Sequence, residues 1–256
     1  MKQQELGMKR IVFPAALAGM MGVMGVVPAY AAIALDRTRI IFDGGNKSVS
    51  LNISNENKEL PYLAQAWIED PDGKKITSPL IVLPPVQRIE AGEKSQLKIQ
   101  GLPAVSQLPQ DRETLYYFNL REIPPRSDKP NTLQIALQTR IKMFYRPTSI
   151  IATPEILANP WQEKLTLERK GDRMQVNNPT PYYITLSSAG AHKDKDIPSF
   201  EAVMVAPFGN AMLNVSASVL GNTPILSYVN DFGGRPTLTF RCAGNSCQVD
   251  ASKRKS

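Results

Sequence analysis

Apolar residues recur at every second position through much of the chain, and this period constrains the fold more than any other feature. Val49, Leu51 and Ile53 alternate with polar side chains, and Leu97 and Ile99 repeat the pattern. A period of two places successive side chains on opposite faces of a β-strand. The same period returns at residues 133–138 and at the pairs Leu165/Leu167, Met174/Val176, Ile184/Leu186 and Leu238/Phe240. We therefore predict an all-β protein.

Denser apolar runs at residues 62–68 and 115–123 predict central strands that are covered on both faces. Residues 141–145 and 225–229 predict further strands, and turn-forming sequences such as Asp70-Pro-Asp-Gly73 separate the runs. Only residues 154–165 predict a short helix. Strands with this length and spacing are typical of antiparallel sandwiches of the immunoglobulin type.

The first 31 residues predict a secretory signal peptide. A basic stretch, residues 1–10, precedes an uncharged run over residues 11–27, and Ala29-Tyr-Ala31 places small residues at the two positions that a signal peptidase reads. The alternative is an uncleaved membrane anchor, but this run is near the lower limit for spanning and is interrupted by glycines and a proline. Whether translation begins at Met1 or Met8 stays open.

A boundary near Arg146-Pro147 divides the remaining chain into two halves, each the size of one sandwich domain. We predict a signal peptide over residues 1–31, an N-terminal domain over 32–147 and a C-terminal domain over 148–256. The two halves show no sequence repeat, so the protein is a two-domain protein rather than an array.

Export permits the two cysteines to be oxidised. Cys242 and Cys247 enclose a Gly244-Asn245 turn signal, which predicts a hairpin closed by a disulfide. The competing interpretation, a redox-active pair, normally requires two intervening residues, and here there are four.

Catalytic constellations are weak, and we predict neither an enzyme nor a cofactor or metal. The single histidine, His192, excludes mechanisms that need a second imidazole, and it falls in a predicted polar loop over residues 189–196. Ser95 and Lys98 have the spacing of serine acyl-enzymes, but in a strand they point to opposite faces. The net charge of +7 comes without a long basic stripe interleaved with aromatics, so no nucleic acid partner is expected.

Two long motifs resemble the periplasmic pilus chaperones, the PapD-like family. They are LPQDRETLYYFNLREIPP at residues 108–125 and LQIALQTRIKMFYRP at residues 133–147. Residues 32–42, 178–183 and 228–236 extend the likeness over nearly all of the chain after the leader. The resemblance implies two immunoglobulin-like sandwich domains arranged around a cleft, in a periplasmic protein.

In that family a pilin subunit lacks its last strand, and the chaperone lends its own edge strand before an outer-membrane usher receives the subunit. The resemblance assigns the lent strand to residues 133–143, with Leu133, Ile135 and Leu137 as the donor side chains. The alternative from periodicity alone is that these three side chains face the chain's own core.

Five charged residues match functional positions of the family. Arg39 and Lys142 match the two cations that bind the carboxylate at the subunit's C-terminus. Glu113, Arg146 and Asp231 match an ion network that sets the angle between the two domains. The alternative function is a secreted two-domain adhesin or receptor module, which needs neither paired cations nor an exposed alternating edge.

Overall fold

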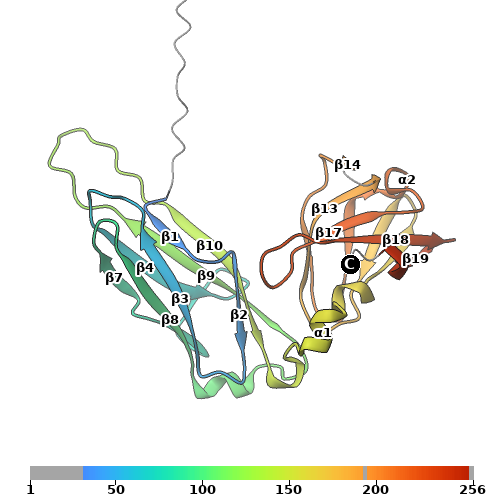
Figure 1. The fold of residues 1–256 in the computed structure, drawn as a ribbon, viewed down its shortest axis with the longest axis horizontal. Helices are drawn as coiled ribbons and strands as arrows, with labels where there is room; N and C mark the ends of the chain where they lie inside the picture. The colour runs from blue at the N-terminus through green and yellow to red at the C-terminus, as the bar shows by residue number, and fades with distance from the viewer. Residues whose placement is uncertain (1–30, 193–194, 254–256) are drawn as a thin grey trace, which may run out of the picture. The chain divides into compact units, whose positions relative to one another are not determined.

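The computed structural model describes residues 31–192 and 195–253, so the predicted leader, apart from Ala31, lies outside the described residues. The described chain is built mostly of β-strands (Figure 1), and the all-β prediction is confirmed. Buried apolar side chains form two separate cores, one before residue 146 and one after residue 160. None of the helices in the described ranges is long and apolar enough to cross a bilayer.

The first core lies between two sheets. One sheet has the order β1 (Ile33–Leu35), β3 (Ser48–Asn55), β8 (Lys94–Gly101), β6 (Leu80–Leu83). The other has the order β2 (Arg39–Asp43), β10 (Gln138–Arg146), β9 (Thr114–Ile123), β4 (Tyr62–Glu69), β5 (Lys75–Ile76), and β7 (Val86–Ile89) also pairs with β4. The alternating residues predicted to be buried, such as Leu51 and Leu97, are fully covered between these sheets. The prediction that β4 is covered on both faces is wrong, because Ala64, Ala66 and Ile68 are buried while Leu63 is exposed.

Strand β10 has one fully paired edge and one partly open edge. It pairs antiparallel with β9 from Gln138 to Tyr145, but parallel with β2 only from Lys142 to Arg146. The open part of the β2-side edge therefore consists of residues 138–141. Two short 3-10 turns, η1 (Pro103–Gln107) and η2 (Thr148–Ile150), lie before β9 and after β10.

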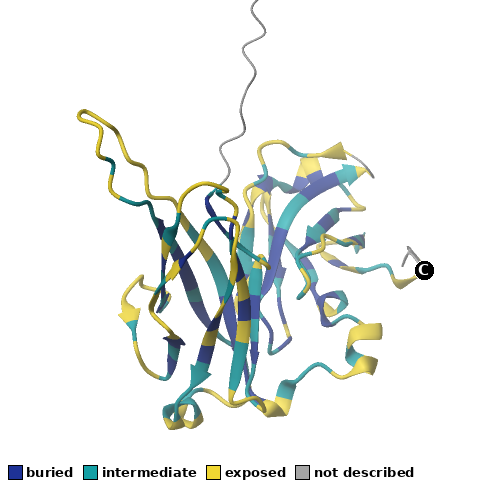
Figure 2. Cartoon of the chain, turned by 60° about the vertical axis from the view of Figure 1, so that its left-hand side comes forward, coloured by how far each residue is buried: buried dark blue, intermediate teal, exposed yellow. Residues whose placement is uncertain are grey.

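The strand predicted from residue 133 begins only at Gln138. Leu137 still receives a hydrogen bond from the N–H of Glu122 at 3.0 Å, but β9 ends at Ile123 and Pro124-Pro125 follows. Proline supplies no N–H for a ladder, so residues 133–137 have no partner strand and no strand is formed. They belong to the exposed loop at the upper left of Figure 2.

The second core lies within one continuous path of strands. The order is β14 (Lys195–Asp196), β13 (Ile184–His192), β17 (Ile225–Tyr228), β18 (Thr237–Ala243), β19 (Ser246–Val249), β11 (Thr166–Lys170), β12 (Arg173–Asn177), β16 (Asn210–Ser216), with β15 (Val203–Val205) on β13. Strand β18 pairs with β17 through its first residues and with β19 through its last, so it belongs to both layers. The polar loop predicted around His192 is wrong in part, because β13 continues to His192 and pairs with β14. His192 itself is exposed, as expected.

The helix predicted over residues 154–165 is divided into α1 (Pro154–Ala158) and a 3-10 turn, η3 (Trp161–Lys164). The Thr153 hydroxyl caps α1 by accepting from the N–H of Ile156, and Pro160 prevents α1 from continuing. A short helix α2 (Ala217–Leu220) and a 3-10 turn η4 (Ala251–Lys253) complete the described elements.

Candidate functional site

The two predicted carboxylate-binding cations lie side by side. Arg39 opens β2 and stands in register with Lys142 of β10, at the point where the open edge of β10 ends. The Arg39 Nη1 donates to the carbonyl oxygen of Val229 at 3.0 Å, and the Lys142 Nζ donates to the Thr185 Oγ1 at 3.0 Å. Both cations, which belong to the first sandwich, are therefore held by hydrogen bonds that they donate to the second.

Neither cation is in an ion pair with any described residue. Burial lowers the pKa of Lys142, and the nearby charge of Arg39 lowers it further. Burial also lowers the pKa of Arg39, although Asp231 and Glu113 act in the opposite direction. The Arg39 Nε is buried without a hydrogen-bond partner. Two partly desolvated cations with a spare donor make a preformed site for an anion.

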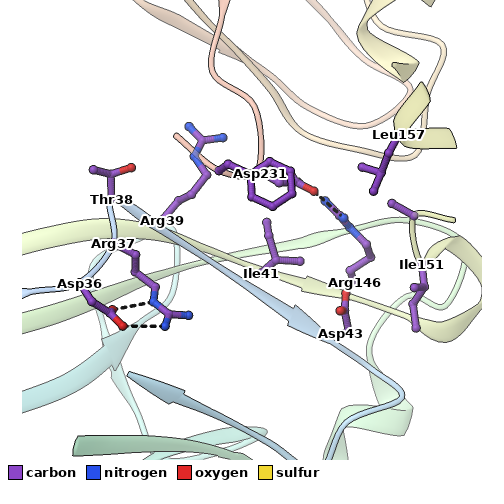
Figure 3. A pocket seen from close by; sticks show the side chains of 12 residues that line it. Asp36, Arg37, Thr38, Arg39, Ile41, Asp43, Arg146, Ile151, Leu157 and Asp231 are labelled. Atoms are coloured by element: carbon purple, nitrogen blue, oxygen red, sulfur yellow. Dashed lines mark hydrogen bonds and ion pairs between the residues drawn. The ribbon is translucent and has the colours of Figure 1, made fainter. Parts of the chain in front are cut away.

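A hollow of about 550 Å³ adjoins Arg39 and is drawn in Figure 3. Its walls combine charged residues with apolar ones, among them Ile41, Ile151, Leu157 and Phe232. The Phe232 side chain is among the most exposed aromatic groups of the described chain. The hollow therefore offers apolar surface beside Arg39.

Glu113, Arg146 and Asp231 form one connected network of hydrogen bonds and ion pairs. Arg146 donates through Nε and Nη2 to the Glu113 Oε1 at 2.9 and 2.7 Å, and through Nη1 to the Asp231 Oδ2 at 2.8 Å. The Arg146–Asp231 contact is visible in Figure 3. The side chains of Arg146 and Glu113 are 3% and 1% exposed, and that of Asp231 is 18% exposed. The network is thus buried at its centre and partly open at Asp231.

The environment of this network shifts two pKa values. Burial raises the pKa of Glu113 to about 7, while the Arg146 charge and a hydrogen bond from the N–H of Tyr183 limit the rise. Burial lowers the pKa of Arg146, but the hydrogen bonds and negative charges of Asp231 and Glu113 outweigh this effect and raise the pKa. The rings of Trp161 and Tyr182 lie 5.2 and 5.0 Å from the guanidinium. Arg146 is charged and held on several sides.

Sequence reasoning missed the residues of the second sandwich that complete these contacts. Thr185, Val229, Tyr182 and Tyr183 carry no chemical signature of a site, and their partners lie far away in the sequence. One signal was available, since Tyr182 and Tyr183 belong to the Asn178-Pro-Thr-Pro-Tyr-Tyr motif. The buried Asn178 amide donates to the Tyr182 carbonyl at 2.7 Å and so fixes this turn.

Leu133, Ile135 and Leu137 are exposed by 84%, 63% and 40%. The alternative that they face the chain's own core does not hold, because none of them packs in either core. These three large apolar side chains recur at every second position and are exposed to water next to the open edge of β10. Such a group of exposed apolar side chains is unusual on a protein surface.

The predicted disulfide is present. Cys242 and Cys247 are bonded and face each other in register across the β18–β19 hairpin. Gly244 in the turn has a φ of +62°, a conformation that glycine adopts without strain. The pair is structural in its setting, because Cys247 is completely buried in the second core.

The weak catalytic candidates do not form a site. The Ser95 hydroxyl donates to the Gln87 Oε1 at 2.6 Å, while Lys98 is exposed on the other face of β8. Among the described residues, no group of three or more His, Cys, Asp or Glu side chains is placed to hold a metal ion.

Comparisons with known proteins place this geometry in a family. Residues 32–151 match the family described as "Pili and flagellar-assembly chaperone, PapD N-terminal domain", and residues 160–240 match "Pili assembly chaperone PapD, C-terminal domain". The chain is 51% identical over 228 residues to the probable fimbrial chaperone YfcS of Escherichia coli K12, with 89% of each chain covered. It is 50% identical over 239 residues to the chaperone protein PapD of Escherichia coli, covering 90% of this chain and 98% of PapD.

Solved structures agree. The periplasmic chaperone SfaE is similar with a TM-score of 0.64 and 31% identity, covering 81% of this chain and 98% of SfaE. The SafB chaperone complex with the SafA pilin of Salmonella enterica gives a TM-score of 0.68 and 28% identity, covering 84% of this chain and 98% of the matched one. Because both family profiles match and the relatives are similar over most of their length, this chain belongs to the PapD family of pilus-assembly chaperones.

Proposed function

We propose that this chain is a periplasmic chaperone that captures pilin subunits by adding a strand of the subunit to β10, and then delivers them to an outer-membrane usher. The observation that carries the proposal is the open edge of β10, which ends at Arg39 and Lys142. An open edge offers backbone hydrogen bonds that do not depend on sequence.

The direction of the added strand follows from this geometry. A strand beside residues 133–141 occupies the side of β10 that β2 occupies further along, and it meets β2 at Arg39. If its terminal carboxylate is to reach the two cations, the strand must run parallel to β10. Charge-assisted hydrogen bonds to the carboxylate then fix the register, and a slip by one residue would turn the wrong side chains inward.

In the donor segment, residues 133–137, the apolar side chains occupy the same alternating positions as the core side chains of β10. Leu133, Ile135 and Leu137 lie an even number of positions before Ile141 and Met143, which pack in the first core. When residues 133–137 extend β10, their apolar side chains therefore point to the same face of the sheet. We propose that they fill the open groove of the subunit.

We further propose that the Arg146 network joins the two domains, taken as residues 32–147 and 148–256. Arg146 ends β10, and Asp231 follows β17 in the second sandwich. A rigid junction keeps Thr185 and Val229 where they hold Lys142 and Arg39. The secreted adhesin or receptor module is not favoured, because the relatives are fimbrial chaperones.

The proposal is tested by substituting the cations. Arg39→Ala or Lys142→Ala should weaken binding of a purified pilin subunit by about 30-fold, equivalent to about 2 kcal/mol. The chaperone's melting temperature should change little, because neither side chain contributes to a core. The matched control is Lys98→Ala, which removes an exposed lysine from β8.

Binding is measured by titrating a pilin subunit released from denaturant, with aggregation of the unbound subunit as a second readout. If both variants stay folded and bind the subunit as tightly as the Lys98→Ala control, the carboxylate-binding role of Arg39 and Lys142 is wrong.

A further inference from the structure

Glu122 is a buried carboxylate that the capture site does not use. It lies near the end of β9, and only 6% of it is exposed. Its Oε2 accepts a hydrogen bond from the N–H of Ile33 at 2.9 Å, and its own N–H donates to the Leu137 carbonyl at 3.0 Å. It therefore connects the start of β1 to the start of β10.

No cation in the described ranges forms an ion pair with this carboxylate. A buried carboxylate with a single side-chain hydrogen bond and no ion-pair partner is costly to desolvate. In the uncleaved chain, therefore, no positively charged group pairs with the Glu122 carboxylate.

The backbone of Ala32 is held beside Glu122. The N–H that follows Ala32, that of Ile33, is bound to the carboxylate, and the Ala32 carbonyl accepts from the N–H of Glu56 at 2.6 Å. Ala32 itself is buried. Three covalent bonds separate the nitrogen of Ala32 from that of Ile33, so the two atoms lie within about 4 Å of each other.

The sequence predicts that a signal peptidase cleaves after Ala31. Hydrolysis of this peptide bond consumes one water, leaves a carboxylate on Ala31 and an amine on Ala32, and the amine takes up a proton at neutral pH. We propose that Glu122 is the binding site for this new ammonium, so that removal of the leader supplies the missing charge.

The uncleaved chain has a neutral amide at this place, whereas the processed chain has an ion pair that is mostly shielded from water. The ion pair fastens β1 to β9 at the end of the sandwich where the donor segment begins. Cleavage therefore strengthens the fold of the first sandwich, independently of whether the proposed subunit capture is right.

The test compares four forms of the processed chain: a free Ala32 terminus or a Gly-Ser extension before Ala32, each with Glu122 or with Glu122→Gln. Glutamine keeps an oxygen that can accept from Ile33 but removes the charge. The extension should lower the melting temperature by about 3 °C when Glu122 is present, and by much less in the Glu122→Gln background. Glu201→Gln, which changes an exposed carboxylate of the second sandwich, is the matched control and should leave the effect of the extension unchanged.

If the extension and Glu122→Gln act additively, the proposal is overturned. A second measurement needs no variant, in case Glu122→Gln does not fold. The rate at which an amine-acylating reagent modifies the Ala32 terminus is measured by mass spectrometry, against the terminus of the extended chain. The Ala32 amine should react several-fold more slowly, and equal rates would also overturn the proposal.

Discussion

Arg39 and Arg146 lie on neighbouring strands of the same sheet, yet their surroundings differ in charge. Arg146 donates to two carboxylates, whereas Arg39 donates to the Val229 carbonyl and its guanidinium lies over the Phe144 ring, 6.0 Å from the centroid. The cost of desolvating the arginine is offset by direct ion pairs in the first case, and only in part by the more distant charges of Asp231 and Glu113 in the second. The same residue type thus serves as a structural cation at one place and as a candidate ligand-binding cation at the other.

The substitution Glu113→Gln should remove a pH dependence of the free energy of unfolding. The folded pKa of about 7 lies above the ordinary value of 4.5, so the folded state binds more protons between these values. The stabilisation from this extra proton is fully present below pH 4.5 and is lost as pH rises through 7. Over this range the parent's free energy of unfolding should therefore fall relative to the variant's by up to about 3 kcal/mol. Urea unfolding across this pH range measures it.

The control for this experiment is Glu90→Gln, which changes an exposed carboxylate paired with Arg88. Its stability curve should run parallel to that of the parent chain. A Glu113→Gln curve that is also parallel to the parent's would show that Glu113 does not gain a proton on folding in this range.

Strand β10 and the segment before it combine three features: exposed apolar side chains at 133–137, an open strand edge at 138–141, and an edge paired with β2 from Lys142 to Arg146. Periodicity predicted its apolar phase correctly, because alternation depends only on neighbouring residues. It did not predict where the strand begins, because that depends on a partner strand that ends elsewhere in the sequence, at Ile123.

Ile135→Glu should abolish subunit capture, because it places a charge in an apolar groove that offers it no partner. Ala136→Glu adds the same charge one position further, where the side chain points to the opposite face, and should bind nearly as well as the parent. Recovery of a co-expressed pilin from the periplasm measures capture for both. Equal recovery with the two variants would contradict the assignment of donor side chains.

The β18–β19 hairpin should lose about 2 kcal/mol of stability when Cys242 and Cys247 are both replaced by serine, since the bond closes only a short loop. Urea unfolding of the variant and of the reduced parent chain gives this value. A loss confined to the serine variant would mean that the serines, rather than the missing bond, cause the change.

At the scale of the whole molecule, polar contacts join the first sandwich to the second. The period-two pattern located most strands and the two cores, and the motifs located Glu113, Arg146 and Asp231. The pairing partners of Arg39 and Lys142 could not be predicted, since Val229 acts through its backbone and Thr185 through one hydroxyl. A backbone carbonyl is present at every residue, so the sequence does not show which one accepts a hydrogen bond from a distant side chain. Tertiary packing decides this.

Asp231→Ala should lower the stability of the whole chain by about 2 kcal/mol, less than the loss of a fully buried partner, because Asp231 is 18% exposed. It should also weaken subunit binding although the donor segment is unchanged. Thermal melting and titration with a pilin subunit measure the two effects. The control Asp111→Ala removes an exposed ion pair and should alter neither; an Asp231→Ala variant that matches it would leave the network without a role in joining the domains.

The parallel pairing of β2 with β10 also sets a length. Because β2 begins opposite Lys142, a guest strand that starts beside Leu133 and stops before Arg39 spans residues 133–141, or nine positions. At about 3.3 Å per residue this is roughly 30 Å. In the proposed capture, the length of the bound segment is therefore counted backwards from the last residue of the subunit, because Arg39 and β2 close the edge at that end.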